Sequence, residues 1–313
     1  MVEARRLHDG LHRCRRSDLT LFEGFSFTEI ETSGAKIRTC HGGSGPPVLL
    51  LHGNPQTLAI WRHVAPRLAE HHTVVCTDLR GYGFSSKPPA GTDFINYSKR
   101  EMARDQLEVM EALGHTRFDL CGHDRGGRVA HRLAMDWPDR VRRIAVLDIA
   151  PTREMYAGTT DAFARGYWHW FMMIKPSPLP ELMMGADPDQ FWRLKCGAQS
   201  AKGLEVFGDA LDEYLEAFRD PEMRRASCDD YRAAAHIDID HDNADGDAKL
   251  PMPLLALWGA KGKIEQCFDC LALWRQRAED VRGHALDCGH YLPEEAPDEV
   301  TSALREFFAD HHG

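Results

Sequence analysis

The chain has 313 residues, 43% of them hydrophobic, and carries a formal net charge of −10 at pH 7. This length suffices for one large α/β domain with an insertion or for two small domains. The acidic balance disfavours nucleic acid as a partner, and no apolar run approaches the roughly 20 residues needed to cross a membrane.

The first 25 residues are predicted to form an N-terminal extension, because arginines and acidic side chains are mixed there without an apolar run. Over residues 26–150, short apolar runs alternate with helix-like segments, which predicts a mostly parallel, doubly wound α/β sheet. Strands buried on both faces of a parallel sheet have such continuous apolar sequences. The runs are at residues 48–51, 73–77, 118–121 and 144–147, and a helix is expected over 98–113.

The pattern changes at Pro151. Residues 151–249 hold most of the tyrosines and methionines and contain no convincing buried strand. Within them, residues 167–173 (YWHWFMM) are apolar nearly all round, as expected of a helix buried on several sides. Residues 151–249 are therefore predicted to form a helical cap, inserted into an α/β core made of residues 26–150 and 250–313.

The segment 122–127 (GHDRGG) lies between an apolar run and a helix-like run, which is the setting of a nucleophile elbow. The usual elbow is GxSxG, but here Asp124 occupies the place of the serine. A carboxylate attacks a saturated carbon and becomes an alkyl ester, so the expected chemistry is alkyl transfer rather than acyl transfer. The alternative is a helix-capping aspartate. The glycines on both sides of Asp124 and the preceding strand favour the nucleophile.

Arg125 and Arg128 are three residues apart and share one face of the first turn of the predicted helix. The helix N-terminus already favours an anion, and two guanidinium groups add donors that match a carboxylate. The alternative is ordinary pairing with acidic neighbours at the surface. Their position beside Asp124 favours binding of a substrate carboxylate.

His290 is the expected general base, because it follows a late Gly in the turn before the last helix, in the chain order of α/β hydrolases. The acid that orients it is less obvious, since the turn after the strand at 254–258 contains no aspartate. Asp148, which follows the strand at 144–147, is the expected partner. Glu265 and Asp269 are competing candidates.

Residues 52–55 (HGNP) end the first buried strand. The backbone N–H groups of Asn54 and Arg125 are predicted to form an oxyanion hole, and His52 is expected to be structural.

The nine cysteines are odd in number and widely scattered, which fits reduced thiols and predicts a cytoplasmic protein. Cys267 and Cys270 form a CxxC motif, but no second pair and no nearby histidine pair completes a zinc site. No metal or cofactor is therefore predicted.

Together these residues resemble one family, the haloacetate (fluoroacetate) dehalogenases of the α/β-hydrolase fold, over about residues 26–310. The resemblance rests on seven motifs: HGNPQT at 52–57, DLRGYG at 78–83, GHDRGGR at 122–128, LDIAPT at 147–152, YWHW at 167–170, DYRA at 230–233 and GHY at 289–291. The paired arginines and the YWHW block are its most specific parts.

The resemblance implies that His169, Trp170 and Tyr231 donate hydrogen bonds to the leaving halide, and that the protein is a homodimer. Two features depart from the family. Asn54 stands where phenylalanine is usual, and the segment 195–208 lacks the Gly-Trp-Gly run of some members. These departures leave the preferred halogen open.

The expected function is hydrolytic dehalogenation of haloacetate and other 2-haloacids to 2-hydroxyacids such as glycolate. An epoxide hydrolase with the same nucleophile is the main alternative, and it would use cap tyrosines such as Tyr231 and Tyr214. A haloalkane dehalogenase is disfavoured because its relatives carry Trp directly after the nucleophile. A non-catalytic carboxylate-binding protein is also disfavoured, since Asp124, Asp148 and His290 are all present.

Overall fold

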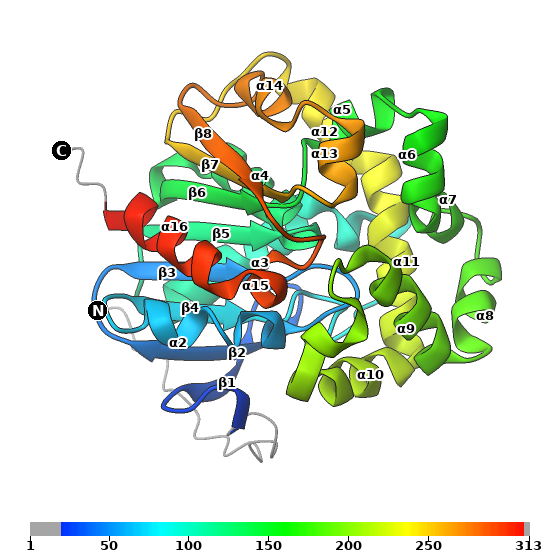
Figure 1. Cartoon of the computed structure of the whole chain (residues 1–313), viewed down its shortest axis with the longest axis horizontal. Coiled ribbons are helices and arrows are strands. Elements are labelled where there is room, and N and C mark those ends of the chain that lie inside the picture. The colour runs from blue at the N-terminus through cyan, green and yellow to red at the C-terminus, as the bar shows by residue number, and fades with distance from the viewer. Residues whose placement is uncertain (1–19, 310–313) are drawn as a thin grey trace.

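The computed structural model describes residues 20–309 (Figure 1). Its centre is an eight-stranded sheet of order β1-β2-β4-β3-β5-β6-β7-β8, in which β1–β2 and β2–β4 are antiparallel and the other pairs are parallel. The strands are β1 (Ser26–Glu31), β2 (Lys36–Gly43), β3 (Pro47–Leu51), β4 (Thr73–Thr77), β5 (Phe118–His123), β6 (Val141–Leu147), β7 (Leu254–Gly259) and β8 (Val281–Leu286). The predicted α/β-hydrolase fold class is confirmed.

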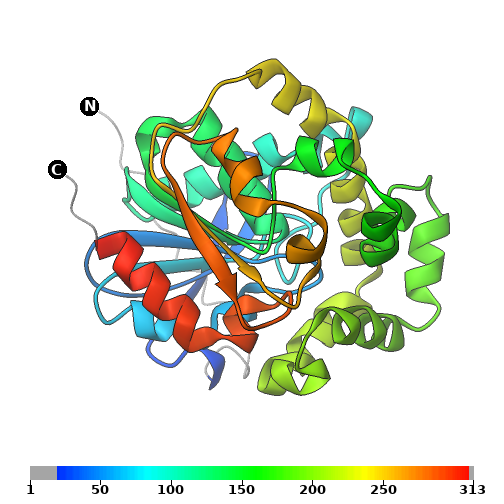
Figure 2. The ribbon, with the colours of Figure 1, turned by 45° about the horizontal axis from the view of Figure 1, so that its top comes forward.

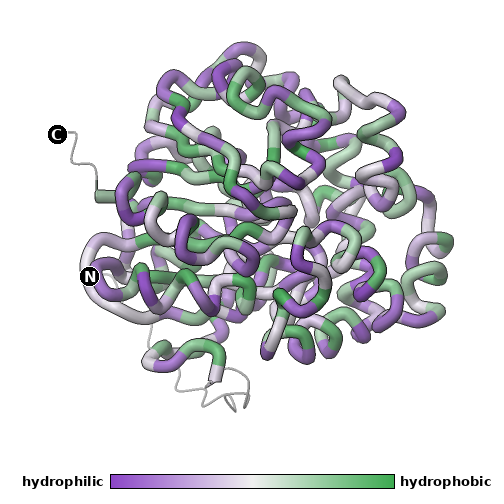
Figure 3. The backbone as a smooth tube through the Cα atoms, in the orientation of Figure 1, coloured by the Kyte–Doolittle hydropathy of each residue, from purple (hydrophilic) through white to green (hydrophobic). Residues whose placement is uncertain are grey.

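The four apolar runs form the parallel strands β3, β4, β5 and β6, and β5 is buried along its whole length. Their side chains join one continuous hydrophobic core, and Figure 3 shows hydrophobic segments along these strands. The edge strands β1 and β8 alternate between more and less exposed positions. They therefore lack the continuous apolar sequence by which the central strands were predicted.

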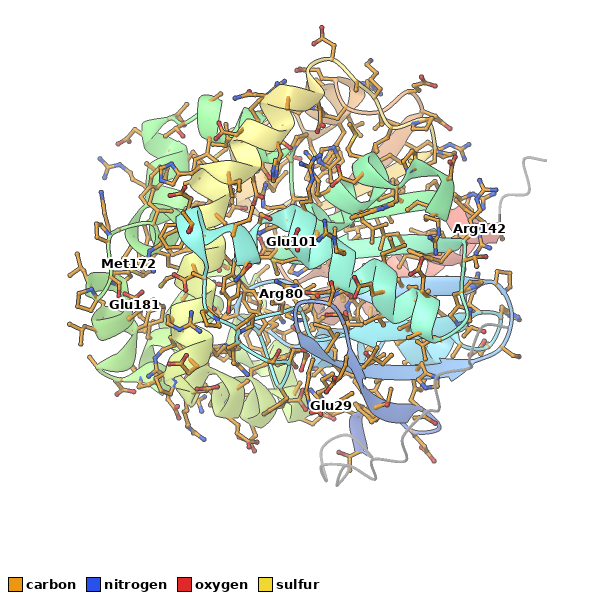
Figure 4. The ribbon with its side chains drawn as sticks, turned by 180° about the vertical axis from the view of Figure 1, so that it is seen from behind. Glu29, Arg80, Glu101, Arg142, Met172 and Glu181 are labelled. Atoms are coloured by element: carbon orange, nitrogen blue, oxygen red, sulfur yellow. The ribbon has the colours of Figure 1, made fainter. Side chains whose placement is uncertain are left out.

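Helices cover both faces of the sheet. The helix α3 (Lys99–Ala112) packs on α4 (Arg125–Asp136), and α3 with its Glu101 is in front when the molecule is seen from behind (Figure 4). The opposite face carries α2 (Ala65–Leu68) and α16 (Pro297–Ala309), which are in front in Figure 1. Three more α-helices follow β7 in the chain: α13 (Lys263–Cys267), α14 (Cys270–Arg275) and α15 (Leu292–Glu295).

Between β6 and β7 the chain leaves the sheet and forms a helical layer beside the carboxyl ends of the parallel strands (Figures 1 and 2). We propose that this layer is the cap. Its α-helices are α5 (Thr152–Ala157), α6 (Asp161–Gly166), α7 (Trp168–Met173), α8 (Leu179–Gly185), α9 (Pro188–Gln199), α10 (Leu211–Arg219), α11 (Pro221–Ala235) and α12 (Ile237–Asp245). Among residues 20–309, no helix has the length and apolar character needed to cross a membrane.

The expected extension at residues 1–25 lies mostly outside the described residues. Its last part differs from the expectation, because Leu21 and Phe22 are buried in the core. The Phe22 ring packs edge-on against Phe25 and Phe27. Folded structure therefore begins before residue 26.

Candidate active site

Asp124 stands at a sharp turn between β5 and α4, with a φ of 46°. A Cβ at position 122 would clash with the carbonyl oxygen of Gly126, and one at position 126 would clash with that of His52. Both glycines are therefore needed for the tight turn. A positive φ at a residue other than glycine costs on the order of 1 kcal/mol or more, and such strain is typical of functional sites.

The carboxylate of Asp124 is buried and faces the loop that follows β3. Its Oδ2 accepts a hydrogen bond of 2.9 Å from the backbone N–H of Asn54, one of the two predicted oxyanion donors. The other, Arg125, begins α4 directly after Asp124. His52 lies behind this loop, where its Nε2 accepts from the N–H of Leu79 and its ring is fully buried.

His290 and Asp148 come together from two separate segments of the core. Nδ1 of His290 lies 2.6 Å from Oδ2 of Asp148, and Oδ1 of Asp148 accepts from the N–H of Gly259 at 2.9 Å. The two competing acids are engaged elsewhere. Glu265 accepts from the indole N–H of Trp258, and Asp269 accepts from a backbone N–H at the start of α14.

Neighbouring charges shift the pKa values of Asp124 and His290. Burial raises the pKa of Asp124, but nearby imidazole and guanidinium groups, His290 foremost, outweigh it and lower that pKa below its ordinary value. Burial lowers the pKa of His290, but the hydrogen bond and charge of Asp148, followed by the charge of Asp124, raise it overall. Asp124 is therefore ionised at neutral pH and available as a nucleophile.

The two arginines differ in their partners. Arg125 forms a bidentate ion pair with Asp230 of α11, at 2.7 Å and 2.8 Å, which leaves its Nη1 without a partner in the described chain. Arg128 donates from Nη1 to the hydroxyl of Thr152 at 2.8 Å. Among residues 20–309 it has no carboxylate partner, and its Nε has no partner of any kind. Buried charged donors without an acceptor are costly, so this region is suited to an anionic ligand.

The three predicted halide donors are buried beside the arginines. The indole N–H of Trp170 has no partner among the described residues, and the guanidinium of Arg128 lies 4.7 Å from the centre of the Trp170 ring. The guanidinium of Arg125 lies 4.2 Å from the centre of the Tyr231 ring, which is 6.1 Å from that of His169. Burial lowers the pKa of His169 far below its ordinary value, so its imidazole is neutral.

Two charged groups of this site were not predicted. Asp230 binds Arg125 and also accepts from Tyr82 and Lys99. Burial raises the pKa of Asp230, but the charges of Arg125 and Lys99 outweigh it and hold that pKa at about 2. Lys195 of α9 is buried, and its Nζ lies 3.4 Å from the backbone carbonyl oxygen of Asn54. Asp230 lies in the DYRA motif, but nothing in that motif points to Arg125, and Lys195 lies in no motif of the resemblance. The fold brings both residues from the cap to the core.

Comparisons with known proteins agree with this arrangement. The family model of the alpha/beta hydrolase fold matches residues 46–297. A fluoroacetate dehalogenase from a Burkholderia species is 44% identical over 93% of this chain and 96% of its own length. A soluble epoxide hydrolase from a Corynebacterium species is 33% identical over 88% of this chain and 95% of its own.

A solved structure has the same fold as this chain. The crystal structure of a proposed alpha/beta hydrolase from Nostoc sp PCC 7120 superimposes with a TM-score of 0.90 at 50% identity, covering 92% of this chain and 99% of that one. The family match extends over most of the chain and includes the central strands, the elbow and His290. The chain therefore belongs to the haloacetate dehalogenase family of the α/β-hydrolase fold superfamily.

Proposed function

We propose that the protein hydrolyses the carbon–halogen bond of haloacetate and related 2-haloacids, giving a 2-hydroxyacid, a halide ion and a proton. One observation carries the proposal: Arg125 and Arg128 present buried donors, unpartnered within the described chain, directly beside the carboxylate of Asp124. A neutral alkyl halide or an epoxide would leave these donors unpaired, whereas a substrate carboxylate would satisfy them. The similarity to the Burkholderia fluoroacetate dehalogenase supports the same substrate class.

In the first step, the arginines hold the carboxylate and place the α-carbon over Asp124. A carboxylate oxygen of Asp124 forms a bond to that carbon while the carbon–halogen bond breaks, and the halide leaves with the bonding electron pair. The N–H and O–H groups of Trp170, His169 and Tyr231 stabilise the departing charge in a buried site. The product of this step is an ester on Asp124.

In the second step, His290 takes a proton from water, which attacks the carbonyl carbon of the Asp124 ester. The bond between that carbon and the ester oxygen then breaks, the 2-hydroxyacid leaves with the proton from His290, and the regenerated carboxyl group of Asp124 ionises and releases a proton. The N–H of Asn54 is placed to stabilise the oxyanion, and Asp148 orients the imidazole and stabilises its protonated form. The negative charge of Asp124 helps to raise the pKa of His290 in the free enzyme. Ester formation removes this charge and so lowers that pKa. The imidazole therefore becomes easier to deprotonate at the stage where a neutral base is required.

The direct test is halide release from fluoroacetate, chloroacetate and bromoacetate, measured side by side with hydrolysis of styrene oxide. Turnover of the haloacids without turnover of the epoxide supports the proposal. Hydrolysis of styrene oxide alone would assign the protein to the activity named for its Corynebacterium relative. Saturable haloacid binding without turnover of either substrate would identify a carboxylate-binding protein.

The epoxide alternative receives less support from the cap tyrosines. An epoxide hydrolase needs acidic O–H groups aimed at the substrate oxygen, and Tyr231 could supply one. The hydroxyl of Tyr214, however, donates to the buried carboxylate of Glu294 at 2.8 Å. Its proton is thus engaged away from Asp124.

The outer face of the cap supports a homodimer. Six large apolar side chains are exposed in the described part of the chain, and five of them belong to neighbouring helices of the cap. The five are Trp168, Leu179, Leu182, Met183 and Leu194. Figure 4 shows this end of the molecule, with Met172 and Glu181 labelled, opposite Arg142. Exposed apolar patches mark association sites, and sedimentation of the Leu182→Lys variant as a monomer would support this interface.

We also propose a cytoplasmic location. The eight cysteines among the described residues are all free thiols, which fits a reducing compartment. Fractionation of the source cells with detection of the protein would test this.

A further inference from the structure

A second group of donors lies beside Asp124 and comes from elements other than the helix that carries the arginines. It consists of the side-chain amide of Asn54, in the loop after β3, and the ammonium of Lys195, on α9. Asn54 is 2% exposed and Lys195 is 5% exposed, so both groups are withdrawn from water. The backbone N–H of Asn54 bonds Asp124 directly, and the Nζ of Lys195 contacts the carbonyl of the same asparagine. The residues that carry the two donors are therefore neighbours of Asp124: the Asn54 backbone bonds it directly, and its charge acts on the Lys195 ammonium.

These donors are poorly satisfied within the protein. Nδ2 of Asn54 has no hydrogen-bond partner among residues 20–309. The two acceptors near Lys195 Nζ, the Asn54 carbonyl and the side-chain oxygen of Gln199, are both neutral and both 3.4 Å away, at the long limit for a hydrogen bond. Within the described chain, Lys195 forms no ion pair with a carboxylate. A buried ammonium with such partners is suited to an anionic oxygen.

The fold holds Lys195 in this place. Lys195 and Gln199 are one turn apart on α9, and the backbone carbonyl of Gln199 accepts from the N–H of His290 at 3.1 Å. The tyrosine that follows His290 also contacts Gln199, through its hydroxyl at 3.3 Å. The helix is thus anchored to the turn that carries the proposed base. Lys195 is presented to the site by a fixed element of the cap rather than by a free side chain at the surface.

We infer that Asn54 and Lys195 form a subsite for a second carboxylate, so that the enzyme accepts 2-halodicarboxylates such as 2-chlorosuccinate. This inference rests on the proposed function. With the first carboxylate on Arg125 and Arg128 and the α-carbon over Asp124, the substituent at that carbon can extend toward the loop after β3. Burial lowers the pKa of Lys195, and a carboxylate bound there would restore its charged form.

The chemistry is unchanged in kind. The halide leaves with the bonding pair as Asp124 forms the ester, and water then releases a 2-hydroxydicarboxylate, regenerating the Asp124 carboxylate and yielding one proton. The second carboxylate does not react. It adds binding energy at a distance from the reacting carbon, and this energy can be used to orient the substrate.

The test compares 2-chlorosuccinate with 3-carbamoyl-2-chloropropionate, in which a neutral amide of the same shape replaces the second carboxylate. Each enantiomer is assayed for chloride release, and the readout is the ratio of the two kcat/KM values. We expect the wild-type enzyme to prefer the dicarboxylate by about tenfold or more, as a charge-assisted contact should provide. The Lys195→Met variant should bring the ratio to about one.

The matched control is Lys175→Met, which removes one positive charge from an exposed position of the same cap and should keep the wild-type ratio. Because both substrates are measured on one preparation, partial loss of folded enzyme cancels in the ratio. A ratio near one in the wild type, or an unchanged ratio in Lys195→Met, would overturn the inference. Chloroacetate has no second carboxylate and therefore separates the subsite inference from the proposed function. If the enzyme releases no chloride from chloroacetate, the proposed function itself is refuted.

Discussion

Replacing Arg128 with methionine should separate substrate binding from protein stability. Arg128 is buried without a carboxylate partner in the described chain, and its protein contacts are a threonine hydroxyl, a distant carbonyl, a methionine sulfur and the Trp170 ring. Removing Arg128 breaks no direct ion pair, and the charge of Asp124 keeps its larger stabilisation by His290. We therefore expect the free energy of unfolding to change by no more than about 1 kcal/mol.

Activity should respond much more strongly. The substrate carboxylate loses a charge-assisted contact worth about 3 kcal/mol, which corresponds to a roughly 100-fold fall in kcat/KM for chloroacetate. Chloroacetamide has no carboxylate, so its slower reaction should be much less affected. The preference for chloroacetate over chloroacetamide should consequently fall by a similar factor, as measured by chloride release from both substrates.

Arg125→Met is the matched comparison, since it removes the other guanidinium but also breaks the ion pair with Asp230. Breaking a buried ion pair costs about 3 kcal/mol or more. Urea denaturation should therefore show marked destabilisation for Arg125→Met and little for Arg128→Met. Equal destabilisation of both variants, or an unchanged substrate preference in Arg128→Met, would refute this reasoning.

Three further predictions follow from the same contacts. His290→Ala should accumulate an ester on Asp124 during reaction with bromoacetate, seen by intact mass and peptide mapping; halide release in a burst without an adduct would contradict the assignment. Asp148→Asn should slow ester hydrolysis by about 10³-fold or more. It should also move the acid limb of the pH profile of kcat to lower pH, because Asp148 raises the pKa of His290 against the effect of burial. An acid limb that does not move would exclude that coupling. The folded-state pKa of Asp230, about 2, lies below its ordinary value, so its stabilising effect is complete above about pH 4 and is lost as the pH falls toward about 2. The unfolding free energy of Asp230→Asn should therefore fall less over that range than that of the wild type, and parallel curves would argue against the ion pair.

The central strands and the elbow were predictable because their signals are local. Continuous apolar runs give the parallel strands, and the glycines around Asp124 give the turn. Strands β1, β2 and β8 were not singled out, because strands at or near the sheet edges mix polar and apolar residues. Asp148 could be selected only by elimination, since the contact with His290 joins positions 142 residues apart.

The difference between the two arginines could not be predicted. In sequence Arg125 and Arg128 are equivalent members of one helical turn, but the fold brings Asp230 to Arg125 from 105 residues away. Lys195 gave no signal for the same reason, because only the docking of α9 brings it to Asn54. Contacts between cap and core depend on how two units of the fold pack, and a local pattern carries no information on that packing.

The most direct test of the central claim is a single turnover of bromoacetate in heavy-oxygen water, with enzyme in excess. If Asp124 is the nucleophile, the glycolate of the first turnover carries an oxygen from the enzyme, and the label enters the Asp124 carboxylate, where peptide mass spectrometry can locate it. Label in the first glycolate with an unlabelled Asp124 would mean that water attacks the α-carbon directly, and it would contradict the ester mechanism.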